Sequence, residues 1–322
     1  MTALTHLRTS DDLIAQHPEH TFLPLPQALN LWQEAGVDVS PFHDGHALLR
    51  ERYAELGLHH LLPLDRVLVA VRSTRPGAFG GFHHPNQGYR YLQMQAVITM
   101  YGGMNEAVPE APALAVLDLL RAYAHDCLHY GSYRSYQLHG GEVVRTQYGL
   151  NFRRQDGRSY SAPDRGTSPT TRNIGVVMEG ACDRESRSIT RRTAATHGGT
   201  AAGINGFAFR DVTGQLDSAD AVELAGAPKD PASESTTYLA SMGRYEANVN
   251  TRYRAFLAEI GQAEAEDLHS LILSSTISGD MTLLCAWLDC RHGPGTFAAM
   301  FMAPGYLSVS GSIDLGGLTL AS

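Results

Sequence analysis

Two histidines four residues apart give the strongest chemical signal in the sequence. They are His125 and His129, in the segment HDCLH, within an apolar stretch that we expect to be a long helix. Residues at positions i and i+4 of a helix lie on the same face, so both imidazoles can bind one metal ion. Asp126 follows the first histidine and offers a carboxylate that could act as a general base, as Glu does in the HExxH motif.

A second predicted helix carries acidic residues at the same spacing. Glu179 and Asp183 lie four residues apart in the segment EGACD. A glutamate from a neighbouring helix is a suitable third zinc ligand, and three protein ligands leave the fourth position to water. Asp183 could accept a hydrogen bond from the other ring nitrogen of a ligand histidine. The sequence therefore predicts a zinc site made of His125, His129 and Glu179, with Asp183 behind it.

This order of motifs resembles the gluzincin arrangement of zinc metallopeptidases. The resemblance rests on HDxxH, a following β-hairpin and a helix with ExxxD, and it covers residues 112–187. It implies that His125, His129 and Glu179 bind zinc, that Asp183 supports a ligand histidine and that the aspartate of HDxxH is the base. It also implies hydrolysis of a peptide-like or small amide substrate.

The sequence departs from the gluzincin pattern at Asp126, where that family has glutamate. The side chain is shorter by one methylene, and a misplaced catalytic group can lower a rate by about 10²-fold. Two alternatives therefore stay open. One is a metal-independent acid/base enzyme of small-molecule biosynthesis, such as a Pictet–Spengler-type condensation of an amino-acid-like substrate. The other is a metal- or ligand-binding protein that resembles the HDxxH proteins of ubiquinone biosynthesis, with Glu142 as an additional candidate ligand.

A glycine-rich segment, RSTRPGAFGGFHHPN, is the second place where chemistry could occur. It contains Arg72, Arg75, His83 and His84 and connects two predicted strands. Arginine can bind a substrate carboxylate through two parallel hydrogen bonds, and histidine is suited to proton transfer. Arg72 and His84 are therefore candidate catalytic residues for a small amino-acid-like substrate. The alternative is a solvated connection between strands.

The composition excludes several classes of function. The 322 residues include 25 basic and 33 acidic side chains, with a net charge of −8, and Lys229 is the only lysine. Schiff-base or P-loop chemistry has almost no lysine to use, and the absence of a basic run argues against a nucleic-acid partner. No apolar run is long enough to cross a membrane, and the N-terminus lacks the apolar core of a signal peptide. We therefore expect a cytoplasmic protein that acts on a small-molecule or peptide-like substrate, either alone or as a homo-oligomer.

The pattern of apolar residues predicts mainly helices. The predicted helices span residues 11–16, 26–35, 41–56, 112–133, 171–195, 236–261, 264–277 and 279–291. Two strands are expected at 64–73 and 89–101, and the Asp156-Gly157 pair predicts the turn of a β-hairpin. The segments 197–207 and 217–235 are predicted to be irregular.

These elements predict an α+β fold that is mostly helical, with a small sheet and a hairpin beside two central antiparallel helices. Residues 1–235 would hold the N-terminal helices, the small sheet and the metal site. Residues 236–322 form a helical region that either is part of the same domain or is separate from it.

Overall fold

The computed structural model describes residues 14–15, 17–73, 80–83, 95–98, 111–154, 156–198, 203–226 and 242–302. Most of these residues are helical, and two small sheets supply the strands, which confirms the predicted α+β, mostly helical fold. None of the described helices is both long and apolar enough to cross a bilayer.

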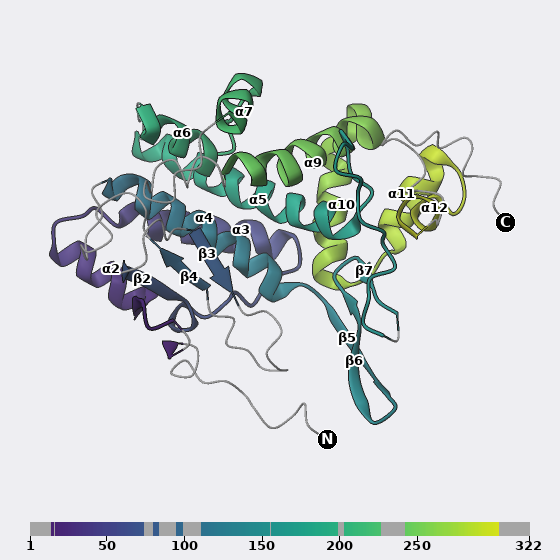
Figure 1. Cartoon of the computed structure of the whole chain (residues 1–322), viewed down its shortest axis with the longest axis horizontal. Helices are drawn as coiled ribbons and strands as arrows, with labels where there is room; N and C mark the ends of the chain where they lie inside the picture. The colour runs from purple at the N-terminus through teal and green to yellow at the C-terminus, as the bar shows by residue number, and fades with distance from the viewer. Residues whose placement is uncertain are drawn as a thin grey trace.

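Two long helices, α4 (Pro112–Gly131) and α5 (Ile174–His197), form the centre of the fold (Figure 1). They run antiparallel, because the last turn of α4 meets the first turns of α5. The side chain of Asn173 caps α5 by accepting a hydrogen bond from the backbone N–H of Val176, and Gly198 ends the helix with a left-handed φ of 69°. Local sequence therefore fixes both ends of α5, the helix that carries Glu179.

Neighbouring helices surround this pair. α3 (Ser40–Glu55) packs against both central helices, whereas α10 (Ala265–Ser278) and α9 (Thr251–Phe256) pack against α5. Other α-helices are α2 (Leu25–Glu34), α6 (Gly203–Val212), α7 (Ser218–Ala225), α11 (Thr282–His292) and α12 (Thr296–Met302). The described chain also contains two 3-10 helices, η1 (Leu64–Arg66) and η4 (Gln262–Glu264). Two π-helical segments are η2 (Glu246–Asn250) and η3 (Leu257–Gly261).

One hydrophobic core joins the N-terminal and C-terminal regions. The buried cluster includes Trp32 and Tyr53 from the first helices, Leu128 from α4, and Ile272 and Phe301 from the C-terminal helices. Burying such large side chains together removes apolar surface from water, which is the main force that holds the helices in place. The helical C-terminal region is therefore packed on the same core as the central helices.

The first sheet has four strands in the order β1-β2-β4-β3. They are β1 (His20–Pro24), β2 (Leu68–Ser73), β4 (Gln95–Ile98) and β3 (Gly80–His83). β2 and β4 are parallel, and the other two pairs are antiparallel. Val67 and Val69 are completely buried, and they connect this sheet to the main core.

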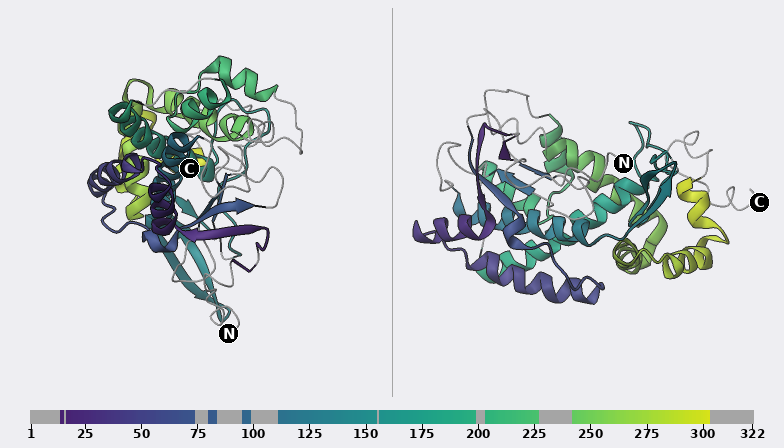
Figure 2. Two further views of the ribbon diagram at one scale, coloured as in Figure 1. Left: turned by 90° about the vertical axis from the view of Figure 1, so that its left-hand side faces the viewer. Right: turned by 90° about the horizontal axis from the view of Figure 1, so that it is seen from below.

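The second sheet connects the central helices. It consists of β5 (Arg134–His139), β6 (Glu142–Tyr148) and β7 (Asn151–Phe152), all antiparallel. The β5–β6 hairpin extends away from the helices (Figures 1 and 2). Its turn is Gly140–Gly141, where both residues have positive φ. The hairpin brings the chain back so that α5 returns alongside α4.

The hairpin prediction placed the main turn incorrectly. Gly140–Gly141 forms it, and the Asp156-Gly157 turn supports only an isolated bridge between Arg153 and Ser159. Gly157 does have the expected positive φ, of 79°. The local turn chemistry was therefore correct, but the strands on either side of Asp156 are too short to form a ladder.

Several other elements differ from the prediction. α6 begins within the first segment predicted to be irregular, α7 lies within the second, and β3 lies within the predicted glycine-rich loop. α6 forms because Phe209 and Val212 pack against Leu117 and Ala194 of the central helices. α7 begins with a capping box in which Asp217 and Asp220 exchange hydrogen bonds. β1 and α12 were not predicted, and most of the helix predicted at 11–16 lies outside the described residues.

Candidate metal centre

Three side chains from α4 and α5 converge on one point. His125 Nε2 lies 2.9 Å from His129 Nε2. The Glu179 carboxylate reaches both rings, with Oε1 at 3.4 Å from His125 Nε2 and Oε2 at 3.1 Å from His129 Nε2. One potential ligand atom from each of these three side chains lies within 4.8 Å of the other two. Among the described residues, this is the cluster of His, Cys, Asp or Glu side chains that could hold a metal ion. The structure thus brings together the three residues that the sequence predicted as metal ligands.

A tyrosine from the hairpin orients one of these rings. Tyr148 Oη is 3.0 Å from His129 Nδ1, and the same hydroxyl donates to the backbone carbonyl of His129 at 3.3 Å. Because the hydroxyl hydrogen is used by the carbonyl, Oη can accept a hydrogen bond from Nδ1–H. This arrangement favours the tautomer of His129 whose Nε2 lone pair is available inside the cluster, to a proton from His125 or to a cation. Burial raises the pKa of Tyr148 to about 12, so its hydroxyl keeps the proton.

Asp183 lies behind the other ring. Its Oδ1 is 3.8 Å from His125 Nδ1, a buried nitrogen with no hydrogen-bond partner among the described residues. The Asp183 side chain is fully buried and ion-paired with Arg187 at 2.6 Å and with Arg121 at 3.5 Å. The carboxylate therefore has a fixed position one small movement away from a hydrogen bond to His125.

The three clustered groups shift one another's pKa values. Burial raises the pKa of Glu179, but the two imidazoles outweigh this effect and hold the pKa well below its usual value. Burial lowers the pKa of His125, but Glu179 and then Asp183 raise it above the ordinary value. The pKa of His129 is lowered by burial and by the charge on His125. An ionised Glu179 and one shared proton between the imidazoles satisfy the cluster, and a cation could take the place of that proton.

Asp126, the predicted base, is buried inside the molecule. Asp126 directly follows His125 in α4 and is only 2% exposed. Burial raises its pKa to about 7, an effect that the charge on His125 opposes and that of Glu179 reinforces. Asp126 is therefore electrostatically coupled to the cluster.

Tyr245 adds a contact that the sequence analysis missed. Its hydroxyl donates a hydrogen bond to Glu179 Oε1 at 2.8 Å. Burial raises the pKa of Tyr245 well above its usual value, so the phenol remains a donor. Glu179 is the most accessible of the three clustered side chains, at 34% exposure against 12% for His125 and 8% for His129. Solvent or a ligand would therefore approach the cluster from the side of Glu179.

The other sequence candidates are elsewhere or are not described. Arg72 is an exposed residue of β2, where its backbone pairs with Thr21, and none of the described contacts joins it to the cluster. Arg75 and His84 lie outside the described residues. Glu142, the additional candidate ligand, is exposed beside the hairpin turn and is not part of the described cluster.

No protein-family model, curated protein or solved structure matches the chain.

Proposed function

We propose that the protein is a zinc-dependent hydrolase that binds one zinc ion through His125, His129 and Glu179. The observation that supports this proposal is the convergence of two Nε2 atoms and one carboxylate from two antiparallel helices. Two histidines and one glutamate form a known catalytic zinc donor set, with a fourth position open to water. Zn–N bonds of about 2.0–2.1 Å in a tetrahedral site place two ligand nitrogens roughly 3.3 Å apart, so a small separation of the two rings would admit the ion.

Bound zinc would supply a Lewis acid and an activated water for attack on a carbonyl. The chain itself would position these reactants. Tyr148 fixes the His129 ring, Asp183 lies 3.8 Å from the His125 ring and would support it after a small movement, and Tyr245 holds one oxygen of Glu179. Asp126, which follows the proposed ligand His125 in α4, would accept the proton from water. The substrate class that fits this chemistry is a peptide-like or small amide.

The cysteines agree with the expected cellular location. Cys127, Cys182, Cys285 and Cys290 are all free. Unpaired thiols are typical of reducing compartments, which supports our proposal that the enzyme acts in the cytoplasm.

Metal analysis of the purified full chain tests the proposal. We expect about one zinc ion per chain and hydrolysis of a panel of small amides that stops on chelation and returns with zinc. His129→Ala should lose the ion and lower hydrolysis by about 10³-fold or more, because the open zinc site disappears. His139→Ala is the matched control, since His139 is exposed in the hairpin. Hydrolysis that resists chelation, or equal losses in the two variants, would rule the proposal out.

One observation favours a second candidate, a metal-independent acid/base enzyme for small amino-acid-like substrates. The Nε2–Nε2 distance of 2.9 Å suits a proton shared between His125 and His129. In this reading, the proton would move between the imidazoles, Glu179 and the substrate. Full turnover of an amino-acid-like substrate by metal-free protein would select this candidate over the hydrolase.

A further inference from the structure

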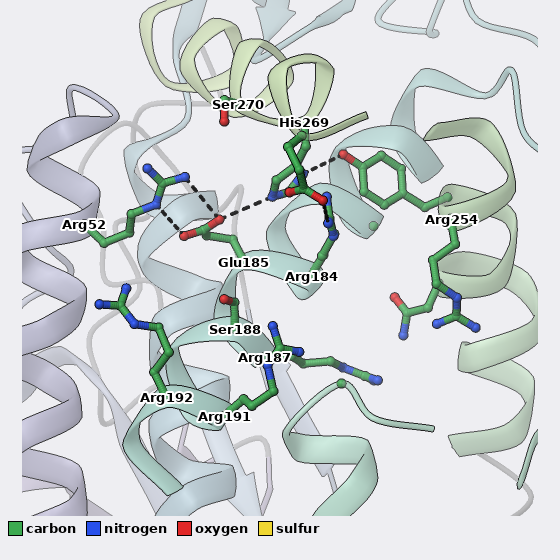
Figure 3. Close-up of a pocket in the computed structure, with 15 residues that line it drawn as sticks. Arg52, Arg184, Glu185, Arg187, Ser188, Arg191, Arg192, Arg254, His269 and Ser270 are labelled. Atoms are coloured by element: carbon green, nitrogen blue, oxygen red, sulfur yellow. Dashed lines mark hydrogen bonds and ion pairs between the residues drawn. The ribbon is translucent and has the colours of Figure 1, made fainter. Parts of the chain in front are cut away.

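A cavity of about 470 Å³ lies beside α5 (Figure 3). Its wall is built from α3, α5, α9 and α10, together with η2 and Gly214. None of the three clustered metal-binding candidates contributes to this wall. Its charged side chains are six arginines and two glutamates, namely Arg52, Arg184, Arg187, Arg191, Arg192, Arg254, Glu185 and Glu266.

Helix α5 supplies one continuous polar stripe of the cavity. Arg184, Ser188 and Arg191 follow one another at intervals of four and three residues, so their side chains lie on one face of the helix. Glu179 is on the opposite side of α5 from Ser188, since nine residues correspond to two and a half turns. The same helix thus presents a carboxylate to α4 and arginines to the cavity.

Three of the arginines are paired with buried carboxylates. Arg52 Nε is 2.8 Å from Glu185, which also lies 3.3 Å from the ring of His269. Arg187 is paired with Asp183 and with two further carboxylates. Arg254 lies 2.7 Å from Glu246. These ion pairs are structural parts of the wall.

The other three arginines retain hydrogen-bonding capacity. Arg184 Nη2 contacts Glu266 at 2.5 Å, but its Nη1 is buried and has no hydrogen-bond partner among the described residues. Arg191 donates to the neutral backbone oxygen of Thr213 at 3.2 Å. Neither Arg191 nor Arg192 has an acidic partner in the described part of the chain, although the whole protein has a net charge of −8. The cavity therefore combines excess positive charge with unused N–H donors.

Two hydroxyls complete the set of donors. Ser188 and Ser270 line the cavity, and their hydroxyls make no hydrogen bond with other described residues. In Figure 3, Ser188 lies between the side chains of Glu185 and Arg187, with Arg191 and Arg192 below it. Guanidinium groups combined with hydroxyls bind phosphate well, because its three oxygens accept several charge-assisted hydrogen bonds in different directions.

We propose that this cavity is a binding site for a small organic phosphate monoester. The two arginines without acidic partners match the double charge of the phosphate. The volume exceeds that of phosphate alone, which leaves space for a small organic group beside Tyr253 and His269. This site is separate from the proposed zinc centre and does not depend on it.

Calorimetric titration of the metal-free full chain with phenyl phosphate, inorganic phosphate and benzoate tests this site. Removing metal prevents phosphate from binding at the zinc centre, so failure here is distinguishable from failure of the proposed hydrolase. At constant ionic strength, we expect one saturable phenyl phosphate site per chain, with weaker binding of inorganic phosphate. Benzoate should bind about tenfold more weakly than phenyl phosphate, since it has one charge and fewer acceptors.

Charge-matched variants then locate the site. Arg191→Ala with Arg192→Ala should weaken phenyl phosphate binding by about tenfold or more. Arg50→Ala with Arg158→Ala removes two exposed arginines outside the cavity wall and should leave the affinity within about twofold of the original. The proposal is overturned by the absence of saturable binding, by benzoate binding as tightly as phenyl phosphate, or by equal losses in the two double variants.

Discussion

The candidate metal centre and the arginine cavity lie on opposite sides of α5. They differ in whether their charged groups are paired with one another. In the candidate metal centre, the two imidazoles and the Glu179 carboxylate lie within hydrogen-bond or ion-pair distance of one another, at the position that a cation could take. In the cavity, Arg191 and Arg192 have no described carboxylate partner, so their charge is available to an anion from solution. Helix α5 therefore directs Glu179 toward α4 and more arginines than carboxylates toward the cavity.

This comparison depends on separating structural arginines from those available to a ligand. Glu185 provides the test, since it binds both Arg52 and His269 within the cavity wall. Glu185→Gln should lower the free energy of unfolding at pH 7 by roughly 3 kcal/mol, because the partly exposed Arg52 and the buried His269 lose their common anion. Urea denaturation measures the change. Glu55→Gln is the matched control, since Glu55 contacts the same arginine but is 67% exposed, and it should have almost no effect.

The pH dependence of unfolding tests whether Glu185 acts as a structural anion. Burial raises the pKa of Glu185, but hydrogen bonds from His269 and Arg52 outweigh it and lower the pKa from 4.5 to about 2. The stabilisation from this carboxylate is therefore complete above about pH 4.5 and disappears as the pH falls toward 2. The difference in unfolding free energy between the original protein and Glu185→Gln should shrink over that range. A difference that stays constant from pH 6 to about pH 2.5 would show that Glu185 is not a structural anion.

A smaller effect is expected at the candidate metal centre, where Tyr148 contacts His129. Tyr148→Phe removes the hydroxyl that contacts His129 Nδ1 but keeps the ring. Loss of such a supporting hydrogen bond should weaken zinc binding by about tenfold, as measured by competition with a chelator of known affinity. Tyr136→Phe changes a tyrosine of the neighbouring strand that is 40% exposed and should leave the affinity unchanged. Equal zinc affinity in both variants would mean that the Tyr148 hydroxyl does not support the metal centre.

The two sites also differ in how far the sequence could predict them. The clustering of His125, His129 and Glu179 was predictable because each half is local: HDCLH and EGACD each place two groups on one helical face. Its additional contacts were not predictable, since Tyr148 and Tyr245 come from a strand and from a distant helical segment. The cavity was missed altogether. Arg52, Glu185 and His269 lie far apart in the chain, and no spacing in the sequence connects them.

The fold shows the same distinction between local and long-range information. The ends of the central helices were predicted to within about three residues from their apolar periodicity and flanking Pro and Gly residues. The capping box of α7 was also a local signal, in Asp217 and Asp220, but its glycine- and alanine-rich surroundings obscured it. β3 could not be predicted because Gly80 and Gly81 become a strand only through pairing with β4.

The smallest expected effect concerns the neutral donors of the cavity. Ser188→Ala removes one hydroxyl without changing the charge, so phenyl phosphate should bind about threefold to fivefold more weakly, the loss expected for one hydrogen bond. Ser274→Ala is the matched control: Ser274 is on α10, one turn after Ser270, but is not part of the cavity wall. A loss at Ser188 alone means that the phosphate is held by directed hydrogen bonds, whereas unchanged affinity in both variants means that only the arginine charge attracts it. The second result would leave an electrostatic patch in place of the specific phosphate site that we propose.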